Sequence, residues 1–328
     1  MKPRVVIDLD AVRHNARLAC KTHERVWAVV KANAYGHGAE QVVSACDGVY
    51  GFCVARAEEA LCVRAHTRKP ILVLGRVSRD EMPQLIAQGI ALTVTDEDAY
   101  CDICTVARTL GAVDIYLKYN CGMNRYGMDA EGIERVLSSP CDAVKVQGMY
   151  SHLPSEAHWD EAISQCATLA VAPNHLAATS AAHRTSACVR MGLGLYGYGL
   201  VGAKRAMRVT ATVQAVRTVQ AGQTVGYGMH YRAERDCDVA IVGIGYGDGF
   251  PRLVSSGYMT VGGSHCPIVG AVCMDVTFLD VTGKGVQVGD EVTVLDDAER
   301  LGNQTNISPY ALLCGWTDRV ERVWLGEQ

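Results

Sequence analysis

Two patterns of apolar and polar positions alternate over the first two thirds of the chain. Short runs that are apolar at nearly every position, such as RVWAVV, are separated by stretches with apolar residues at helical spacing, such as the one after Asp8. The apolar runs predict eight strands, at residues 25–30, 49–54, 71–75, 90–94, 114–119, 144–150, 175–180 and 187–192. Eight strand–helix repeats whose strands are apolar on both faces are typical of a parallel (β/α)8 barrel.

A different pattern begins near residue 206. The runs VTATVQAVRTV, DVAIVGIG and DEVTVLD are rich in β-branched residues, Gly-containing turns separate them, and helical periodicity is weak. This pattern favours a mainly antiparallel β domain. We therefore predict an α/β protein with a (β/α)8 barrel over residues 1–205 and a β domain over residues 206–328.

Composition and charge narrow the functional class. The 328 residues are 49% hydrophobic and 20% charged, as in ordinary globular enzymes, and the formal net charge of −4 argues against a nucleic-acid-binding protein. We expect neither a signal peptide nor a membrane helix, and hence a cytoplasmic protein. The 14 cysteines are scattered, so we interpret them as reduced apolar residues, and Cys101-x-x-Cys104 as helix packing rather than a metal site.

The most distinctive local feature is the segment VKANAYGHG at residues 30–38. Lys31 directly follows the first predicted barrel strand, at the end of the barrel where active sites lie, and a partly desolvated lysine there can act as a nucleophile. Position alone favours a surface lysine whose ammonium group stays in water. The small residues around Lys31 would let a flat ligand approach the backbone, and Tyr35 offers a hydroxyl for a phosphate.

This segment resembles the lysine motif of the alanine racemase family. The resemblance continues through IDLDAVRHN, LKYNCGMNRYGM, GMYSHLPSEA, RMGLGLYGYG, VGYGMHYRAERD, VGIGYGDGFPR and GAVCMD, and so covers nearly the whole chain. It implies pyridoxal phosphate carried on Lys31, a small amino-acid substrate, and no metal. It also implies a homodimer in which the β domain of one subunit completes the barrel site of the other.

The resemblance also implies a role for each matching residue. Lys31 and Tyr227 would be the two acid–base groups, acting on opposite faces of the substrate α-carbon. Cofactor contacts are implied for Tyr35, His152, Ser180, Arg190, Gly192 and Leu193, substrate contacts for Arg125, Met274 and Asp318, and supporting roles for Lys118, Asp275 and Tyr246. Arg190 would face the pyridine nitrogen and donate to it without protonating it. Lys118 matches a lysine that many members carboxylate to hold the arginine at position 125.

Two positions depart from the family pattern. Ala271 replaces an arginine that lines the channel entrance, and Asp318 stands where many members have a tyrosine near the phosphate and the substrate side chain. A carboxylate at position 318 can bind a hydroxyl group, so a roomier and more polar pocket is expected. Serine racemisation, alone or beside alanine racemisation, is therefore the alternative to a strict alanine enzyme.

Two further classes of protein are alternatives to a racemase. A non-catalytic pyridoxal-phosphate-binding barrel would need no β domain, whereas here the β domain contains Tyr227 and Met274. A decarboxylase on this barrel would pair the pyridine nitrogen with a carboxylate, and an aldolase would need a metal site. The arginine at position 190 favours racemisation.

Overall fold

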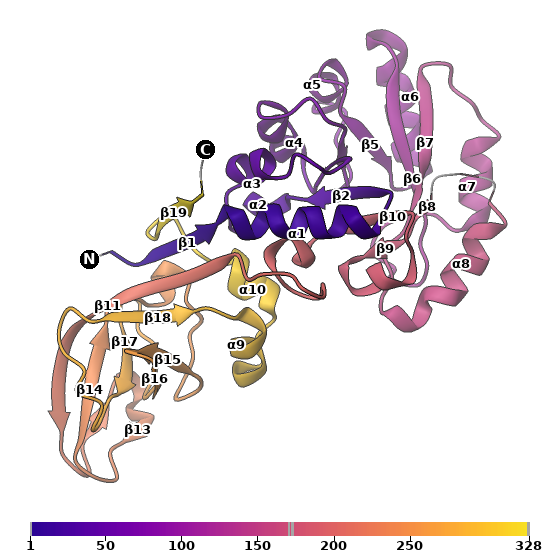
Figure 1. The fold of residues 1–328 in the computed structure, drawn as a ribbon. Coiled ribbons are helices and arrows are strands. Elements are labelled where there is room, and N and C mark those ends of the chain that lie inside the picture. Colours follow the sequence, from indigo (N-terminus) through magenta and orange to yellow (C-terminus); the bar gives the residue numbers. More distant parts are fainter. Residues whose placement is uncertain (1, 170, 172–173, 327–328) are drawn as a thin grey trace. The chain divides into compact units, whose positions relative to one another are not determined.

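The computed structural model describes residues 2–169, 171 and 174–326 (Figure 1). The chain divides into two compact units. One, here called the barrel unit, comprises Ala11–Ala34 and Gly38–Lys204. The other, the β unit, comprises Met1–Asp10, Tyr35–His37 and Arg205–Gln328.

The barrel unit is built on a ring of parallel strands. The strands are β2 (Arg25–Val29), β3 (Gly51–Val54), β4 (Ile71–Val73), β5 (Ala91–Val94), β6 (Val113–Lys118), β7 (Val144–Tyr150), β8 (Asn174–His175), β9 (Ala177–Ala178) and β10 (Cys188–Met191). Each of β2 to β7 pairs with the next, β7 pairs with β8, and β9 pairs with β10, which returns to β2. Leu176 separates β8 from β9, and together they occupy one strand position. The eight positions close the predicted (β/α)8 barrel.

Helices connect these strands. They are α1 (Leu9–Thr22), α2 (Lys31–Tyr35), α3 (Ala39–Ala45), α4 (Ala57–Arg64), α5 (Met82–Ala87), α6 (Glu97–Leu110), α7 (Ala130–Leu137) and α8 (Trp159–Ala167), with 3-10 turns η1 (Glu156–His158), η2 (Thr179–Arg184) and η3 (Leu193–Tyr196). The side chain of Asp96 caps α6 by accepting a hydrogen bond of 2.8 Å from the Ala99 N–H. Cys104 is buried on this helix and Cys101 is exposed, as expected for helix packing.

The β unit contains a mainly antiparallel sheet, as predicted. Its strands are β1 (Arg4–Asp8), β11 (Met207–Val219), β12 (Thr224–Val225), β13 (Tyr231–Arg232), β14 (Cys237–Val242), β15 (Tyr258–Val261), β16 (Ser264–Pro267), β17 (Thr277–Asp280), β18 (Glu291–Leu295) and β19 (Glu321–Leu325). The order β16-β15-β18-β11-β1-β19 forms the main path, and β14 joins β11 to β17. Two 3-10 turns, η4 (Tyr227–Met229) and η5 (Tyr246–Asp248), and two helices, α9 (Ala298–Thr305) and α10 (Pro309–Cys314), complete the unit.

The N-terminal strand belongs to this second sheet. β1 pairs antiparallel with β11, with Val5 opposite Val209, and parallel with β19, with Val5 opposite Arg322. The first residues of the chain therefore close a sheet whose other strands lie more than 200 residues later.

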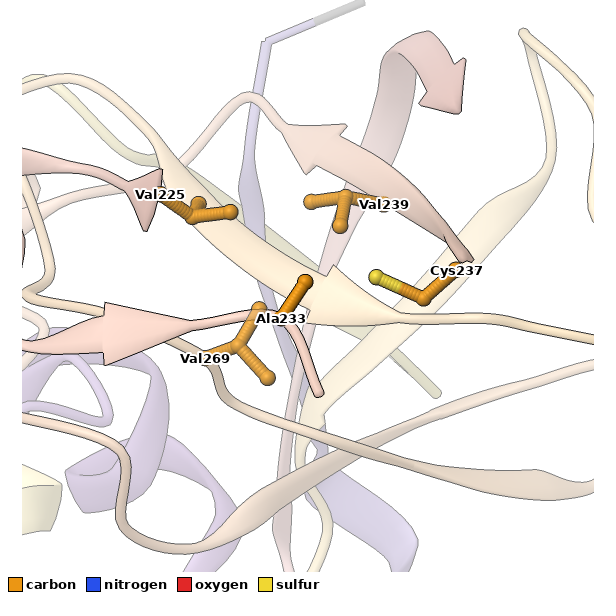
Figure 2. Packing of buried hydrophobic residues seen from close by; sticks show 5 residues of the cluster. All are labelled: Val225, Ala233, Cys237, Val239 and Val269. Carbon is orange, nitrogen blue, oxygen red and sulfur yellow. The ribbon is translucent and has the colours of Figure 1, made fainter. Parts of the chain in front are cut away.

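A separate apolar cluster lies at the other end of β11. Val225, Ala233, Cys237, Val239 and Val269 pack together there, as Figure 2 shows. The cluster supports the segment that leads into η4, because Val225 directly precedes Gly226 and Tyr227.

No helix in the portion of the chain that the structure describes has both the length and the apolar character needed to span a bilayer.

Candidate active site

The predicted residues of the barrel unit lie at the carboxyl ends of the parallel strands. Lys31 is the second residue after β2, and Lys118 is the last residue of β6. His152 is the second residue after β7, and Arg190 is the penultimate residue of β10. Since the carboxyl ends of parallel barrel strands share one rim, these four side chains come from the rim at which barrel enzymes hold their substrates.

The backbone after Lys31 is unusual. Four consecutive non-glycine residues of α2, from Ala32 to Tyr35, have φ between 52° and 54°, so they form a left-handed turn. Such a turn costs roughly 1–2 kcal/mol per residue, and it persists only where neighbouring groups hold it. The Ala32 N–H donates to Glu59 Oε1 at 2.7 Å, and Asn33 Oδ1 accepts from the Ala39 N–H at the start of α3 at 2.8 Å.

The next three residues of the motif belong to the β unit. Gly36 has φ of 81°, and a Cβ built on it would lie 2.3 Å from the Leu313 carbonyl oxygen, so only glycine fits. The His37 carbonyl accepts a hydrogen bond of 2.8 Å from Trp324 Nε1. Tyr35 is buried, and its ring centroid lies 5.7 Å from that of Tyr310. The small and aromatic residues of the motif are therefore explained by packing as well as by chemistry.

Arg190 is a buried cation held by neutral acceptors. It is 4% exposed, and its two terminal nitrogens donate to the carbonyls of His175, Ser151 and Leu176. Nη1 also lies 3.1 Å from His175 Nδ1. These bonds occupy both terminal nitrogens of the guanidinium. An arginine without a carboxylate partner can donate to a ring nitrogen but cannot protonate it.

Positive charge accumulates around this arginine. Burial, and then Arg190, Lys118, Arg125 and Lys31, lower the pKa of His152 to about 3. Burial, followed by Arg190 and Arg125, holds the pKa of Lys118 well below its usual range. The charged groups that move these two pKa values are cations, apart from a small opposing effect of the Cys121 thiol on Lys118. Such a cluster suits anionic ligands, since a phosphate and a carboxylate would relieve its repulsion.

Two aromatic residues of the cluster were not found by motif reasoning. Lys118 Nζ lies 4.4 Å from the centroid of the Tyr150 ring, and Arg190 Cζ lies 5.0 Å from the same centroid. The His175 ring stacks on Tyr150 at 5.1 Å. Tyr150 ends β7 two residues before His152, and that closeness in sequence was the signal available for it.

The predicted phosphate-binding loop is shaped by another residue that the motifs missed. The hydroxyl of Thr179 accepts from the Gly192 N–H at 3.1 Å and from the Gly194 N–H at 3.2 Å. The Gly192 N–H, which the resemblance assigned to the phosphate, is thus donated to Thr179 in this structure. Ser180 is exposed beside Thr179, and Leu193 is half-buried at the start of η3.

Four of the predicted residues of the β unit share one pocket. Tyr227 from η4, Tyr246 from η5, and Met274 and Asp275 from the loop before β17 line a cavity of about 720 Å³. Gly226, Cys273, Val276 and Phe278 complete its lining. Tyr227 is 72% exposed and Met274 51% exposed, so the pocket presents apolar groups on the surface of this unit.

Glycines on both sides of Tyr227 let the turn present its phenol. Gly226 and Gly228 have φ of 74° and 71°. A Cβ on Gly226 would lie 3.2 Å from the Phe278 ring, and one on Gly228 would lie 2.4 Å from the His230 ring. Side chains at these positions would therefore distort the turn that carries Tyr227.

The two departures from the family pattern lie in different surroundings. Asp318 is exposed, and its Oδ1 is 4.0 Å from Arg322 Nη1. It lines a small hollow of about 300 Å³ with Lys2, Arg4, Arg319 and Glu321. Ala271, expected at a channel entrance, is only 3% exposed and forms a backbone bridge with Val254.

Protein-family models and known relatives match nearly the whole length of the chain. The model "Alanine racemase, N-terminal domain" matches residues 7–199, and "Alanine racemase, C-terminal domain" matches residues 206–324. An alanine racemase of Sorangium cellulosum is 33% identical, and the alignment covers 99% of both chains. An alanine racemase of Nitrosococcus oceani is 32% identical over 98% of both chains.

Solved structures agree with these matches. The biosynthetic alanine racemase from Pseudomonas aeruginosa superposes with a TM-score of 0.92 at 29% identity, covering 99% of both chains. The alanine racemase from Bartonella henselae, solved with covalently bound pyridoxal phosphate, has a TM-score of 0.90 at 26% identity, covering 99% of this chain and 100% of that one.

A barrel with cations at its rim, followed by a β unit with an exposed tyrosine pocket, defines a pyridoxal-phosphate-dependent amino-acid racemase. The chain belongs to the alanine racemase family.

Substitution of Gly36 tests the packing of the lysine motif. Gly36→Ala combines a positive φ with a contact of 2.3 Å to backbone, so we expect a fall in melting temperature at least twice that of Gly289→Ala. Gly289 has φ of 98° with open space around it, and it therefore carries the backbone cost alone. Thermal unfolding measures both variants. Equal falls would show that the contact with Leu313 is relieved without cost.

Proposed function

We propose that this protein interconverts the L and D forms of a small amino acid, alanine first, with pyridoxal phosphate held on Lys31. The observation that carries this proposal is the environment of Arg190, a buried cation at the rim of the barrel that, among the residues the structure describes, bonds only to neutral acceptors. A decarboxylase would need a carboxylate there. Membership of the family and the exposed pocket around Tyr227 support the same reaction.

The cation cluster fits the cofactor. Tyr35, Ser180 and the Leu193 N–H would hold its phosphate, the Arg190 Nε–H would meet its ring nitrogen, and His152 would lie beside the ring. Gly192 would contribute its N–H only if Thr179 released it. When bound, pyridoxal phosphate withdraws electrons from the substrate α-carbon and so eases loss of its proton.

The protein's own groups would move that proton. Lys31 Nζ would remove or deliver it on one face of the carbon, and the Tyr227 hydroxyl would do so on the other. A phenol is a weak base at neutral pH. The neutral imidazole of His152, whose pKa is about 3, would accept a hydrogen bond from this hydroxyl and add no charge of its own. Arg125 and the Met274 N–H would bind the substrate carboxylate, with Asp275 and Tyr246 supporting this loop.

The active form is proposed to be a homodimer with shared sites. The exposed pocket of Tyr227 and Met274 is the surface that would face the barrel rim of the partner subunit.

The ten buried cysteines suit a reducing compartment, so we propose a cytoplasmic location. Supply of a D-amino acid for cell-wall synthesis is the proposed purpose.

Mixed dimers test the reaction and the shared site together. Lys31→Ala and Tyr227→Phe should each lower kcat by roughly 10²–10⁴-fold. After the two inactive variants are mixed and subunits exchange, half of the dimers contain one intact site of two, so roughly a quarter of the wild-type activity should return. Chiral chromatography of L-alanine incubations measures it.

A tyrosine outside the pocket provides the control for this experiment. Tyr258→Phe, on β15, should retain wild-type activity. If the mixture stays inactive although each variant binds the cofactor, the site is not shared between subunits. An inactive wild-type enzyme would contradict racemisation itself.

Lys118 is proposed to be carboxylated. Its lowered pKa makes the amine neutral at a lower pH than for an ordinary lysine, and a neutral amine adds to CO2 with loss of one proton to form a carbamate. The new negative charge would lie among Arg125 and Arg190 and reduce their repulsion. Incubation with ¹³C-bicarbonate should give a protein-bound carbamate signal by NMR in the wild type and in Lys69→Ala, but not in Lys118→Arg. A signal that survives Lys118→Arg would refute the assignment.

The substrate preference is proposed to depend on Asp318. A carboxylate at this position can accept a hydrogen bond from a serine hydroxyl, so serine is the alternative substrate, alone or with alanine. The buried position of Ala271 gives no support to a contribution from that residue. Exchange of Asp318 for the family tyrosine should lower the serine-to-alanine ratio of kcat/KM about tenfold, or about 1.4 kcal/mol. A ratio unchanged in Asp318→Tyr would exclude this role, and Glu321→Gln, in the same hollow, is the control.

A further inference from the structure

Arg319 joins the three loops that carry the predicted substrate-side residues of the β unit. Its Nη2 donates to Asp275 Oδ1 at 2.6 Å, and its Nε lies 3.1 Å from Asp248 Oδ1. Asp275 adjoins Met274, and Asp248 ends η5, which begins at Tyr246. Arg319 itself directly follows Asp318.

The loops are also connected through their backbones beneath this side chain. The Tyr246 N–H donates to the Cys273 carbonyl at 3.0 Å, and the Gly247 N–H donates to the Met274 carbonyl at 2.8 Å. The Thr317 N–H donates to the Asp248 carbonyl at 3.1 Å. The direction of the Met274 peptide therefore depends on η5, and η5 is tied in turn to the segment before Arg319.

Gly247 makes room for the arginine. A Cβ built on Gly247 would lie 2.3 Å from Arg319 Nη1 and 3.0 Å from the Met274 carbonyl oxygen. Asp248 is almost fully buried, and its second carboxylate oxygen accepts from the Gly245 N–H at 2.9 Å. A planar guanidinium can reach both carboxylates across Gly247, whereas a lysine ammonium cannot bridge them in the same geometry.

We infer that Arg319 is a positioning residue for binding of the substrate carboxylate. By holding Asp275 and Asp248, it keeps the Met274 peptide in place. This inference rests on the proposed function, because the role of Met274 belongs to that proposal. Arg319 touches neither the cofactor nor the reacting carbon in this account, so its loss should weaken substrate binding more than the chemical step.

Arg319→Met tests the inference in the holoenzyme. We expect KM for L-alanine and the inhibition constant of propionate, a carboxylate without an amine, each to rise about tenfold, with kcat changed less than about threefold. Arg319→Lys should lie between Arg319→Met and wild type, and Gly247→Ala, which displaces the guanidinium, should reproduce the effect of Arg319→Met.

Arg205 provides a matched control. It also bridges two carboxylates of the β unit, donating to Asp297 Oδ2 and Glu299 Oε2 at 2.9 Å each. Neither of these carboxylates lines the Tyr227 pocket, whereas Asp275, a partner of Arg319, does. Arg205→Met should leave KM and propionate inhibition unchanged. The inference on Arg319 has a clear contrary outcome. It is overturned if Arg319→Met lowers only the melting temperature, or if KM and the inhibition constant of propionate stay within twofold of wild type. If Arg319→Met does not fold, Arg319→Lys and Gly247→Ala decide by the same criteria. Absence of racemisation by the wild type would instead refute the proposed function.

Discussion

The left-handed turn after Lys31 is the constraint on which the candidate site depends. Four L-residues with φ near 53° cost several kcal/mol, since each carries roughly 1–2 kcal/mol of steric strain. Contacts from Glu59 and from the start of α3 hold one side of the turn, and the packing of Gly36 holds the other. In return the turn carries the chain away from β2, which ends at Val29, and the chain passes from the barrel unit into the β unit within four residues of Lys31.

The second main feature of the candidate site is the concentration of positive charge at the barrel rim. The barrel rim gathers Arg190, Lys118, His152 and Arg125, and burial, followed by repulsion from the neighbouring cations, lowers the pKa values of Lys118 and His152. Buried cations are costly without anions, so this arrangement is consistent with a cofactor that supplies a phosphate and a substrate that supplies a carboxylate. The β unit contributes different chemistry, an exposed phenol and a backbone N–H, on loops braced by Arg319. The proposed reaction needs both sets of groups.

Local pattern predicted much of the fold. The eight apolar runs correspond to the barrel strands, because a strand buried on both faces must be apolar along its whole length. The pattern carried no information on the partners of β1, because β11 and β19 are distant in sequence. It also missed the split at Leu176 between β8 and β9, since a change of pairing partner leaves no mark on hydrophobicity.

For the candidate site, the sequence by itself determined which residue types are present and where they stand in the motifs: Lys31 after a buried strand, Tyr227 between glycines, and an arginine rather than a carboxylate at position 190. Tertiary structure decided what surrounds them. Three contacts join residues from separate segments. The Thr179 hydroxyl accepts from the Gly192 N–H, the Tyr150 ring contacts Lys118 and Arg190, and Arg319 bridges Asp248 and Asp275. Hydrogen bonds and charge interactions act through space, and their partners are known only once the chain has folded.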